Sequence, residues 1–242
     1  MHPDHALMLE DLRRLARPVS GAPVQNDSYG GSGRPYFNIS VPHRRAMAKA
    51  WLARHRAEGP QAALALVESL FDGASHEEKT LAAILLGYSA PARAAATPAD
   101  LDRWLGKLNG WAEVDNLCQN VFSAAEMGRD WPAWKALIEA LTLSPDINRR
   151  RAALVLLTGP TARSDDDGFH DLAFRTIEAL KGEKPILITK AVSWLLRAMA
   201  ARRPDAVAAY LDREADSLPA VAVRETRIKL TTGTKSGKRR GG

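Results

Sequence analysis

Apolar residues recur at intervals of three and four positions along most of the chain, and this spacing predicts a succession of amphipathic helices. Residues 81–88 (LAAILLGY) show the pattern clearly. Ser75 followed by Glu78 matches the capping box of a helix start, and several prolines stand where a first helical turn tolerates them. Convincing alternation of apolar and polar residues, which marks a half-buried strand, does not occur. We therefore expect an all-α protein.

The predicted helices are short and closely spaced, which is typical of an α-solenoid of stacked antiparallel helical pairs, of the HEAT or armadillo kind. We expect one such domain over residues 1–230 and a basic, disordered tail over 231–242. Residues 18–41, rich in Gly, Ser and Pro, predict a long loop that is mobile or shaped by a ligand, and 162–168 predict an acidic loop. The expected helices span residues 5–17, 42–57, 60–72, 75–89, 98–108, 111–127, 131–142, 146–158, 168–181, 185–202, 204–214 and 219–230.

The charge balance favours an anionic partner. The chain carries 34 Lys and Arg against 28 Asp and Glu, a formal net charge of +6. Such an excess is found in proteins that bind nucleic acid, although many basic proteins bind none. The tail between Lys235 and Arg240 contributes part of it and need not belong to any site.

Several classes of protein are excluded or disfavoured by what the sequence lacks. A single cysteine, Cys118, leaves no internal disulfide framework and no cysteine cluster for a metal. The N-terminal stretch lacks the apolar core of a signal peptide, and no segment approaches the roughly 20 apolar residues that span a bilayer. Walker-type phosphate loops and the HExxH and GxSxG motifs are also missing. We expect a cytosolic monomer with no membrane association, no metal and no cofactor.

The predicted helix at 185–202 has an unusual polar face. At about 100° per residue, Lys190, Trp194 and Arg197 cluster opposite the core stripe. A tryptophan between two cations suggests an aromatic platform flanked by phosphate-binding groups. The alternative is that another helix covers Trp194. The core stripe itself consists of Ile188, Val192, Leu195 and Met199.

The segment 110–122 (GWAEVDNLCQNVF) places a carboxylate beside an apolar stripe. Trp111 and Asp115 share one flank at i and i+4, and Asp115 lies about 80° from the centre of the stripe. A carboxylate at that rim is partly desolvated yet can face a groove, as a catalytic acid, base or electrostatic stabiliser does. A solvated helix aspartate is the alternative. The predicted stripe consists of Val114, Leu117, Cys118, Val121 and Phe122.

Three consecutive cations, Arg149, Arg150 and Arg151, open the apolar helix expected from residue 146. Cations in a first turn oppose the helix dipole, so local helix stability does not explain them. An anion bound by all three arginines would explain their position. A solvated basic turn and intramolecular salt bridges are the alternatives.

Four segments of the chain resemble the AlkD-like DNA alkylation repair glycosylases, whose fold is a superhelix of HEAT-like repeats with a concave basic groove. Their order and separation fit that family from about residue 5 to 230. The Trp-x-x-x-Asp motif of Trp111 and Asp115 is the most diagnostic part. The matching segments are YFNISVPHRR at 36–45, GWAEVDNLC at 110–118, NRRRAALVLL at 148–157 and KAVSWLLRAMAARRPDAV at 190–207.

The resemblance implies roles for individual residues. Asp115 matches the catalytic aspartate, and Trp111 and Trp194 match aromatic residues that contact the lesion-bearing nucleotide and its backbone. Arg151 and Arg197 match cations of the DNA-facing groove, and Tyr29 matches a tyrosine of the N-terminal region. The loop around residues 30–34 departs from the relatives, which leaves the lesion preference open.

The resemblance implies a monofunctional DNA glycosylase that removes cationic N3- or N7-alkylpurines from double-stranded DNA. No lysine is marked as a Schiff-base nucleophile. Two alternatives stay open: a non-catalytic helical-repeat module that binds nucleic acid or protein, and a related glycosylase specialised for bulky adducts. A carboxylate at Asp115 argues against the first, since a pure phosphate binder gains nothing from an anion in its groove.

Overall fold

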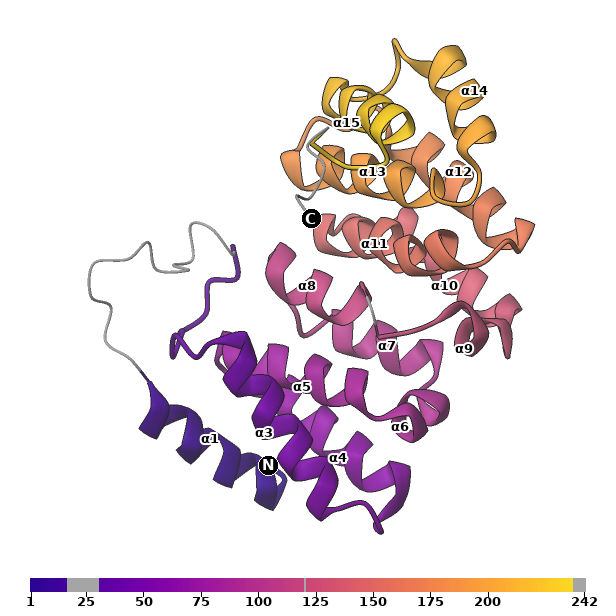
Figure 1. Ribbon diagram of the computed structural model, residues 1–242. Helices are drawn as coiled ribbons and strands as arrows, with labels where there is room; N and C mark the ends of the chain where they lie inside the picture. The colour runs from indigo at the N-terminus through magenta and orange to yellow at the C-terminus, as the bar shows by residue number, and fades with distance from the viewer. Residues whose placement is uncertain (17–30, 120, 237–242) are drawn as a thin grey trace. The chain divides into compact units, whose positions relative to one another are not determined.

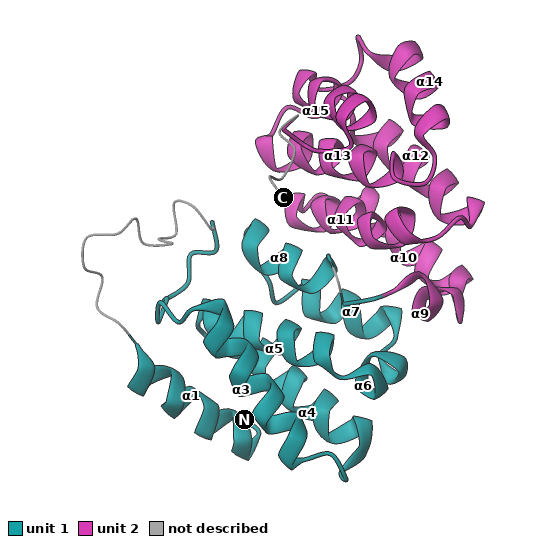
Figure 2. Cartoon of the chain, in the orientation of Figure 1, with its two compact units in different colours: residues 1–122 teal, residues 123–242 magenta. Residues whose placement is uncertain are grey.

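A computed structural model describes residues 1–16, 31–119 and 121–236, and within these ranges the chain forms helices and irregular connections without a strand. The chain divides into two units, residues 1–122 and residues 123–242 (Figure 2). The helices of each unit pack in adjacent pairs, so the predicted all-α helical-repeat architecture is confirmed.

Unit 1 is built from two layers of helices (Figure 1). Helices α3, α5 and α8 pack side by side in one layer, and α1, α4 and α6 follow one another in the second. Helix α5 contacts both layers and is the central helix of the unit. The helices are α1 (Pro3–Leu15), α3 (Val41–Arg54), α4 (Gly59–Phe71), α5 (His76–Tyr88), α6 (Ala90–Ala95), α7 (Pro98–Leu105) and α8 (Trp111–Cys118).

The first turn of α5 is a run of buried polar side chains, residues 75–80. Charged groups can be buried only where partners replace water, because an unpaired buried charge costs several kcal/mol. Glu78 receives hydrogen bonds from Ser75 at its own helix start and lies 2.8 Å from Nε2 of His5 on α1. Lys79 donates to the carbonyl of Phe71 at the end of α4. The run therefore ties α5 to its neighbours through specific polar contacts.

The segment 31–40, which precedes α3, is held by the same run. The backbone N–H groups of Phe37 and Ile39 donate to the Glu77 carboxylate at 2.9 and 3.3 Å. The His76 N–H donates to the carbonyl of Pro35 at 3.1 Å, and the His76 ring stacks on Tyr36. We expected residues 18–41 to be mobile or shaped by a ligand. Residues 31–40 form the predicted loop, which hydrogen bonds within the protein hold, and residues 18–30 lie outside the described ranges.

Unit 2 repeats the two-layer arrangement (Figure 1). Helices α11, α13 and α15 pack in series, while α10 and α12 lie side by side in the second layer with α14 paired to α15. Helix α11 is buried without interruption from Arg151 to Thr161, as expected of an apolar helix with neighbours on all sides. The helices are α9 (Ala124–Gly128), α10 (Trp131–Thr142), α11 (Ile147–Arg163), α12 (Asp167–Leu180), α13 (Ile186–Met199), α14 (Pro204–Glu214) and α15 (Ala220–Thr232).

The two largest departures from the expected helix boundaries are in α8 and α11, and the other boundaries agree to within three residues. The single helix expected over 111–127 is two helices, because α8 ends at Cys118 and a capping box of Ser123 and Glu126 starts α9. The helix expected to end at residue 158 continues to Arg163 although it contains Pro160. Proline removes one helical hydrogen bond, and here the loss falls in the last turn. Helix α6 was not expected from the sequence.

The pH dependence of stability tests the buried Glu78. Burial alone raises the pKa of this carboxyl, but hydrogen bonds from His5 and Ser75 outweigh burial and lower the pKa to about 2. A carboxyl whose pKa is lowered by folding stabilises the protein at pH values above the pKa that it has in the unfolded chain, about 4.3. This contribution is lost as the pH falls toward 2. We expect the free energy of unfolding to fall less steeply between pH 5 and 2 in Glu78→Gln than in the wild type.

Urea unfolding at several pH values measures this difference. Glu126→Gln alters the capping box of α9, where the glutamate is partly exposed, and serves as the control. Equal slopes for Glu78→Gln and the wild type would show that the buried carboxylate makes no special contribution.

Candidate functional site

Helix α8 presents Trp111 and Asp115 one turn apart in unit 1. The helix follows Gly110, whose φ of 75° is a left-handed conformation that glycine adopts without strain. Asp115 is 9% exposed and Trp111 is partly exposed. The predicted stripe is buried in full, and its members on α8, Val114, Leu117 and Cys118, confirm the predicted orientation of the helix. Asp115 thus lies at the rim of the buried surface, where desolvation strengthens electrostatic interactions.

A second acidic side chain of α8, Glu113, was missed by the sequence analysis. Its carboxylate is fully buried, accepts a hydrogen bond from the Asn109 N–H at 3.0 Å, and lies 3.3 Å from Nε of Arg34. Nδ1 of His76 lies 3.4 Å from the other oxygen of Glu113. A glutamate in a first turn is common on exposed helices, so its position gave no signal of burial.

Helix α13 in unit 2 carries the second group of predicted residues. Its predicted core stripe is buried in full, while Lys190 is exposed and Trp194 is partly exposed. The predicted orientation of α13 is therefore confirmed, and Trp194 is not a core residue. Arg197, on the same face, has a partner within the protein. Its Nε lies 3.4 Å from a carboxylate oxygen of Glu225 on α15.

The environment of Arg197 is partly desolvated. Burial lowers the pKa of the guanidinium, and the charge of Glu225 offsets part of that shift. Ser193 joins the pair, because its hydroxyl donates to Glu225 at 2.7 Å and accepts from Arg197. The arginine therefore connects α13 to α15.

The three arginines at the start of α11 differ from one another. Arg149 is partly exposed. Arg150 forms a two-point ion pair with Glu183, at 2.7 and 3.1 Å, and its remaining nitrogen donates to backbone carbonyls of residues 144 and 145. Arg151 is buried and donates to the carbonyl of Leu187 in the first turn of α13. For Arg150 these contacts favour the alternative of intramolecular salt bridges.

The predicted residues thus form two groups that belong to different units. Trp111 and Asp115 share α8 in unit 1. The cations of α11 and the residues of α13 share unit 2, where the two helices pack against each other. Tyr29 lies outside the described residues, so its predicted role stays a prediction.

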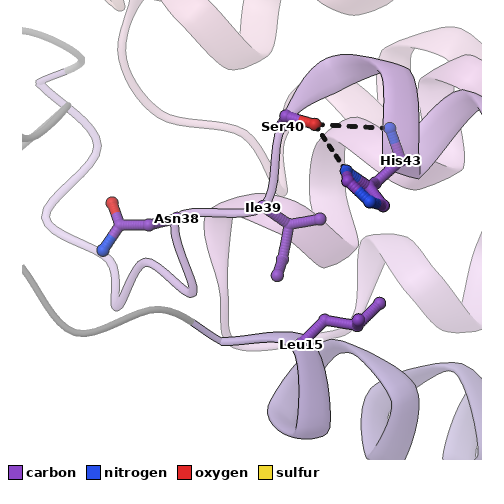
Figure 3. Close-up of a pocket in the computed structure, with 5 residues that line it drawn as sticks. All are labelled: Leu15, Asn38, Ile39, Ser40 and His43. Carbon is purple, nitrogen blue, oxygen red and sulfur yellow. Dashed lines mark hydrogen bonds between the residues drawn. The ribbon is translucent and has the colours of Figure 1, made fainter.

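A small pocket in unit 1 lies between the end of α1 and the start of α3 (Figure 3). It is lined by Leu15, residues 38–40 and His43, and Ser40 contacts the His43 ring within it. Its volume of about 100 Å³ is below the roughly 300–1,000 Å³ of typical ligand sites. The pocket therefore does not suit a purine base.

No three His, Cys, Asp or Glu side chains of the described residues gather as around a metal ion. None of the helices in the described ranges is long and apolar enough to cross a bilayer.

Comparison with known proteins identifies the family. Residues 8–230 match the model of the DNA alkylation repair enzymes, and the chain belongs to this family. A solved structure of a predicted DNA alkylation repair enzyme from Enterococcus faecalis has a similar fold, with a TM-score of 0.61 and 17% sequence identity over 93% of this chain and 94% of that chain. At that identity the likeness concerns the fold. No curated protein matches the sequence.

Membership of the family confirms the resemblance found in the sequence. It indicates an enzyme with a role in the repair of alkylated DNA, and DNA as its partner. It therefore favours an enzyme over a non-catalytic binding module.

The partial exposure of Trp194 gives a stability prediction. Replacing a buried Trp by Ala costs about 3–5 kcal/mol of unfolding free energy, because a cavity remains. Trp134 on α10 is buried in the same unit and is the matched control. We expect Trp134→Ala to show a loss in this range and Trp194→Ala a clearly smaller one, as measured by urea unfolding. Equal losses would assign Trp194 to the core.

Proposed function

We propose that the protein is a monofunctional DNA glycosylase that hydrolyses the N-glycosidic bond of cationic N3- and N7-alkylpurines in duplex DNA. The observation that carries this proposal is the largely buried Asp115, one turn after the partly exposed Trp111, in a chain of the DNA alkylation repair family. A desolvated carboxylate beside an aromatic ring suits a reaction that develops positive charge.

The proposed chemistry needs little acid catalysis. An alkylated purine carries a formal positive charge, so it leaves as a neutral base when it takes the electron pair of the glycosidic bond. Positive charge then develops on the deoxyribose, and a water molecule adds to C1′ and loses a proton. In its ionised form Asp115 would stabilise the sugar cation and orient that water. The face of Trp111 would add cation–π attraction.

The residues of unit 2 are proposed to bind DNA. Lys190 and Arg149 are accessible to phosphates, and Trp194 offers an aromatic face beside Lys190 on α13. Arg150, Arg151 and Arg197 have partners inside the unit. We propose that they act mainly by fixing α11 and α13, with a smaller direct contribution to phosphate binding than their charge suggests.

The salt dependence of duplex binding distinguishes cations that contact phosphates directly from cations that hold the helices in place. Each neutralised phosphate contributes about 0.9 to the slope of log affinity against log salt concentration. We expect Lys190→Gln to reduce the slope by about that amount and to leave stability unchanged. Arg150→Gln should lower the unfolding free energy, because Glu183 loses its ion pair, and should keep the slope of the wild type. A slope that falls as much in Arg150→Gln as in Lys190→Gln would contradict this division.

Replacing Asp115 tests the catalytic proposal. Asp115→Asn keeps the shape of the side chain and removes its charge, so duplex binding should persist while base release falls. The loss of one preorganised electrostatic contact typically reduces a rate on the order of 10²–10³-fold. The measurement is single-turnover release of 7-methylguanine, with binding of the same duplex measured in parallel.

Substrate and variant controls define the outcome of this experiment. Asp171→Asn makes the same change at an exposed position of α12 and should keep the wild-type rate. A uracil-containing duplex should not be processed, because uracil carries no positive charge in DNA and would leave as an anion unless an acid protonated it. A duplex with a bulky N7 adduct tests the alternative of a bulky-lesion glycosylase. Failure of the wild-type protein to release any alkylated base would refute the glycosylase proposal.

A further inference from the structure

We propose that Glu113 is a positioning residue, whose buried carboxylate fixes the start of α8 and thereby places Trp111 and Asp115. The proposal rests on the proposed function for its effect on base release, but its structural part is independent of that function. It is carried by the contacts of Glu113 and by the chemistry of the helix start.

The start of α8 has no capping side chain of its own. Gly110 occupies the N-cap and cannot accept a hydrogen bond from the first turn through a side chain. Glu113, at the third helical position, reaches back to the N–H of Asn109, one residue before the N–H that the glutamate of a capping box accepts from. The carboxylate thus determines where the helix begins.

A helix start alone does not require a buried glutamate. An exposed glutamate at this position would favour the helix dipole equally well and would keep its hydration. Here the side chain is fully buried, and Arg34 and His76 surround it from outside α8. These contacts connect the start of α8 to the segment 31–40 and to α5. They fix the position of α8 within unit 1, and such contacts are not required for the helix itself to be stable.

The segment 31–40 supports the same helix start at further points. Nη2 of Arg34 donates to the carbonyl of Lys107 at 2.8 Å, just before α8. Nδ2 of Asn109 donates to the carbonyl of Ser32 at 3.1 Å. A Cβ atom on Gly31 would lie 4.0 Å from Cα of Gly110, an ordinary van der Waals distance, so the two glycines are neighbours. Residues 31–34 therefore hold the connection that precedes α8 through these contacts.

The position of Asp115 follows from that of Glu113 because the two residues are two positions apart in one short helix. A misplacement of about 1 Å in a catalytic group can cost on the order of 10²-fold in rate. A variant that loosens the start of α8 should therefore slow base release strongly and leave duplex binding by unit 2 largely intact. Glu113 itself need not touch the substrate.

The test uses Glu113→Gln in protein labelled with 5-fluorotryptophan. The chain has six tryptophans, and Trp111→Phe identifies the fluorine resonance of Trp111. We expect Glu113→Gln to shift or broaden the Trp111 resonance, leave those of Trp131, Trp134 and Trp194 in place, and reduce single-turnover release of 7-methylguanine about 10²-fold. If Glu113→Gln does not fold, Arg34→Gln replaces it in the experiment, because the Arg34 side chain is partly exposed. This variant should show the same change in the Trp111 resonance and in base release.

Glu77→Gln is the matched control. Glu77 is also a buried carboxylate that holds the segment 31–40, but it accepts hydrogen bonds from Phe37 and Ile39 and not from the start of α8. We expect it to lower stability and to leave the Trp111 resonance unchanged. An unmoved Trp111 resonance in a folded Glu113 or Arg34 variant would overturn the proposal. So would a moved resonance with a wild-type rate of base release. If the wild-type protein releases no base, the resonance alone decides whether Glu113 positions α8.

Discussion

The structure of unit 1 depends on the burial of charged side chains in the first turn of α5. Burial of Glu77, Glu78 and Lys79 is unfavourable unless every charge has a partner, and the partners come from α1, the end of α4 and the segment 31–40. Burial also lowers the pKa of Lys79 to about 8, which shows how strongly the site is desolvated. Apolar contacts alone would tolerate small displacements of these elements, whereas hydrogen bonds to buried charges specify one arrangement.

This polar centre extends to the candidate catalytic helix. His76 belongs to the buried run and also faces Glu113, so the same constraint that orders α5 reaches the start of α8. The apolar stripe of α8 determines which face is buried, and Glu113 determines where along its axis the helix begins. An active site held to within about 0.5 Å needs both kinds of restraint, because side chains that approach the substrate are only as well placed as their supporting residues.

The sequence predicted the helices and their orientation better than it predicted these partners. The spacing of apolar residues at three and four positions predicted which face of α13 is buried. It also correctly predicted that Lys190 and Trp194 lie outside the core. Spacing could not reveal that residues 75–80 are buried, since a run of His, Glu and Lys ordinarily faces water. Their burial follows from contacts across 35 to 75 positions of the chain, and no local pattern encodes these. For the same reason Glu113 was overlooked while Asp115, next to an apolar stripe, was singled out.

The cations of unit 2 illustrate a related limit of charge as a guide to DNA binding. Arg150 shares α11 with Arg149, and Arg197 shares α13 with Lys190. Arg150 and Arg197 are each paired with a glutamate outside their own helix. A phosphate that recruited Arg150 would have to replace a two-point ion pair and two carbonyl contacts, whereas Lys190 needs only to shed water. Paired arginines lose little further side-chain freedom when DNA arrives, because the fold has already ordered them. In the proposed mode of binding, their value therefore lies in a rigid support for the accessible residues.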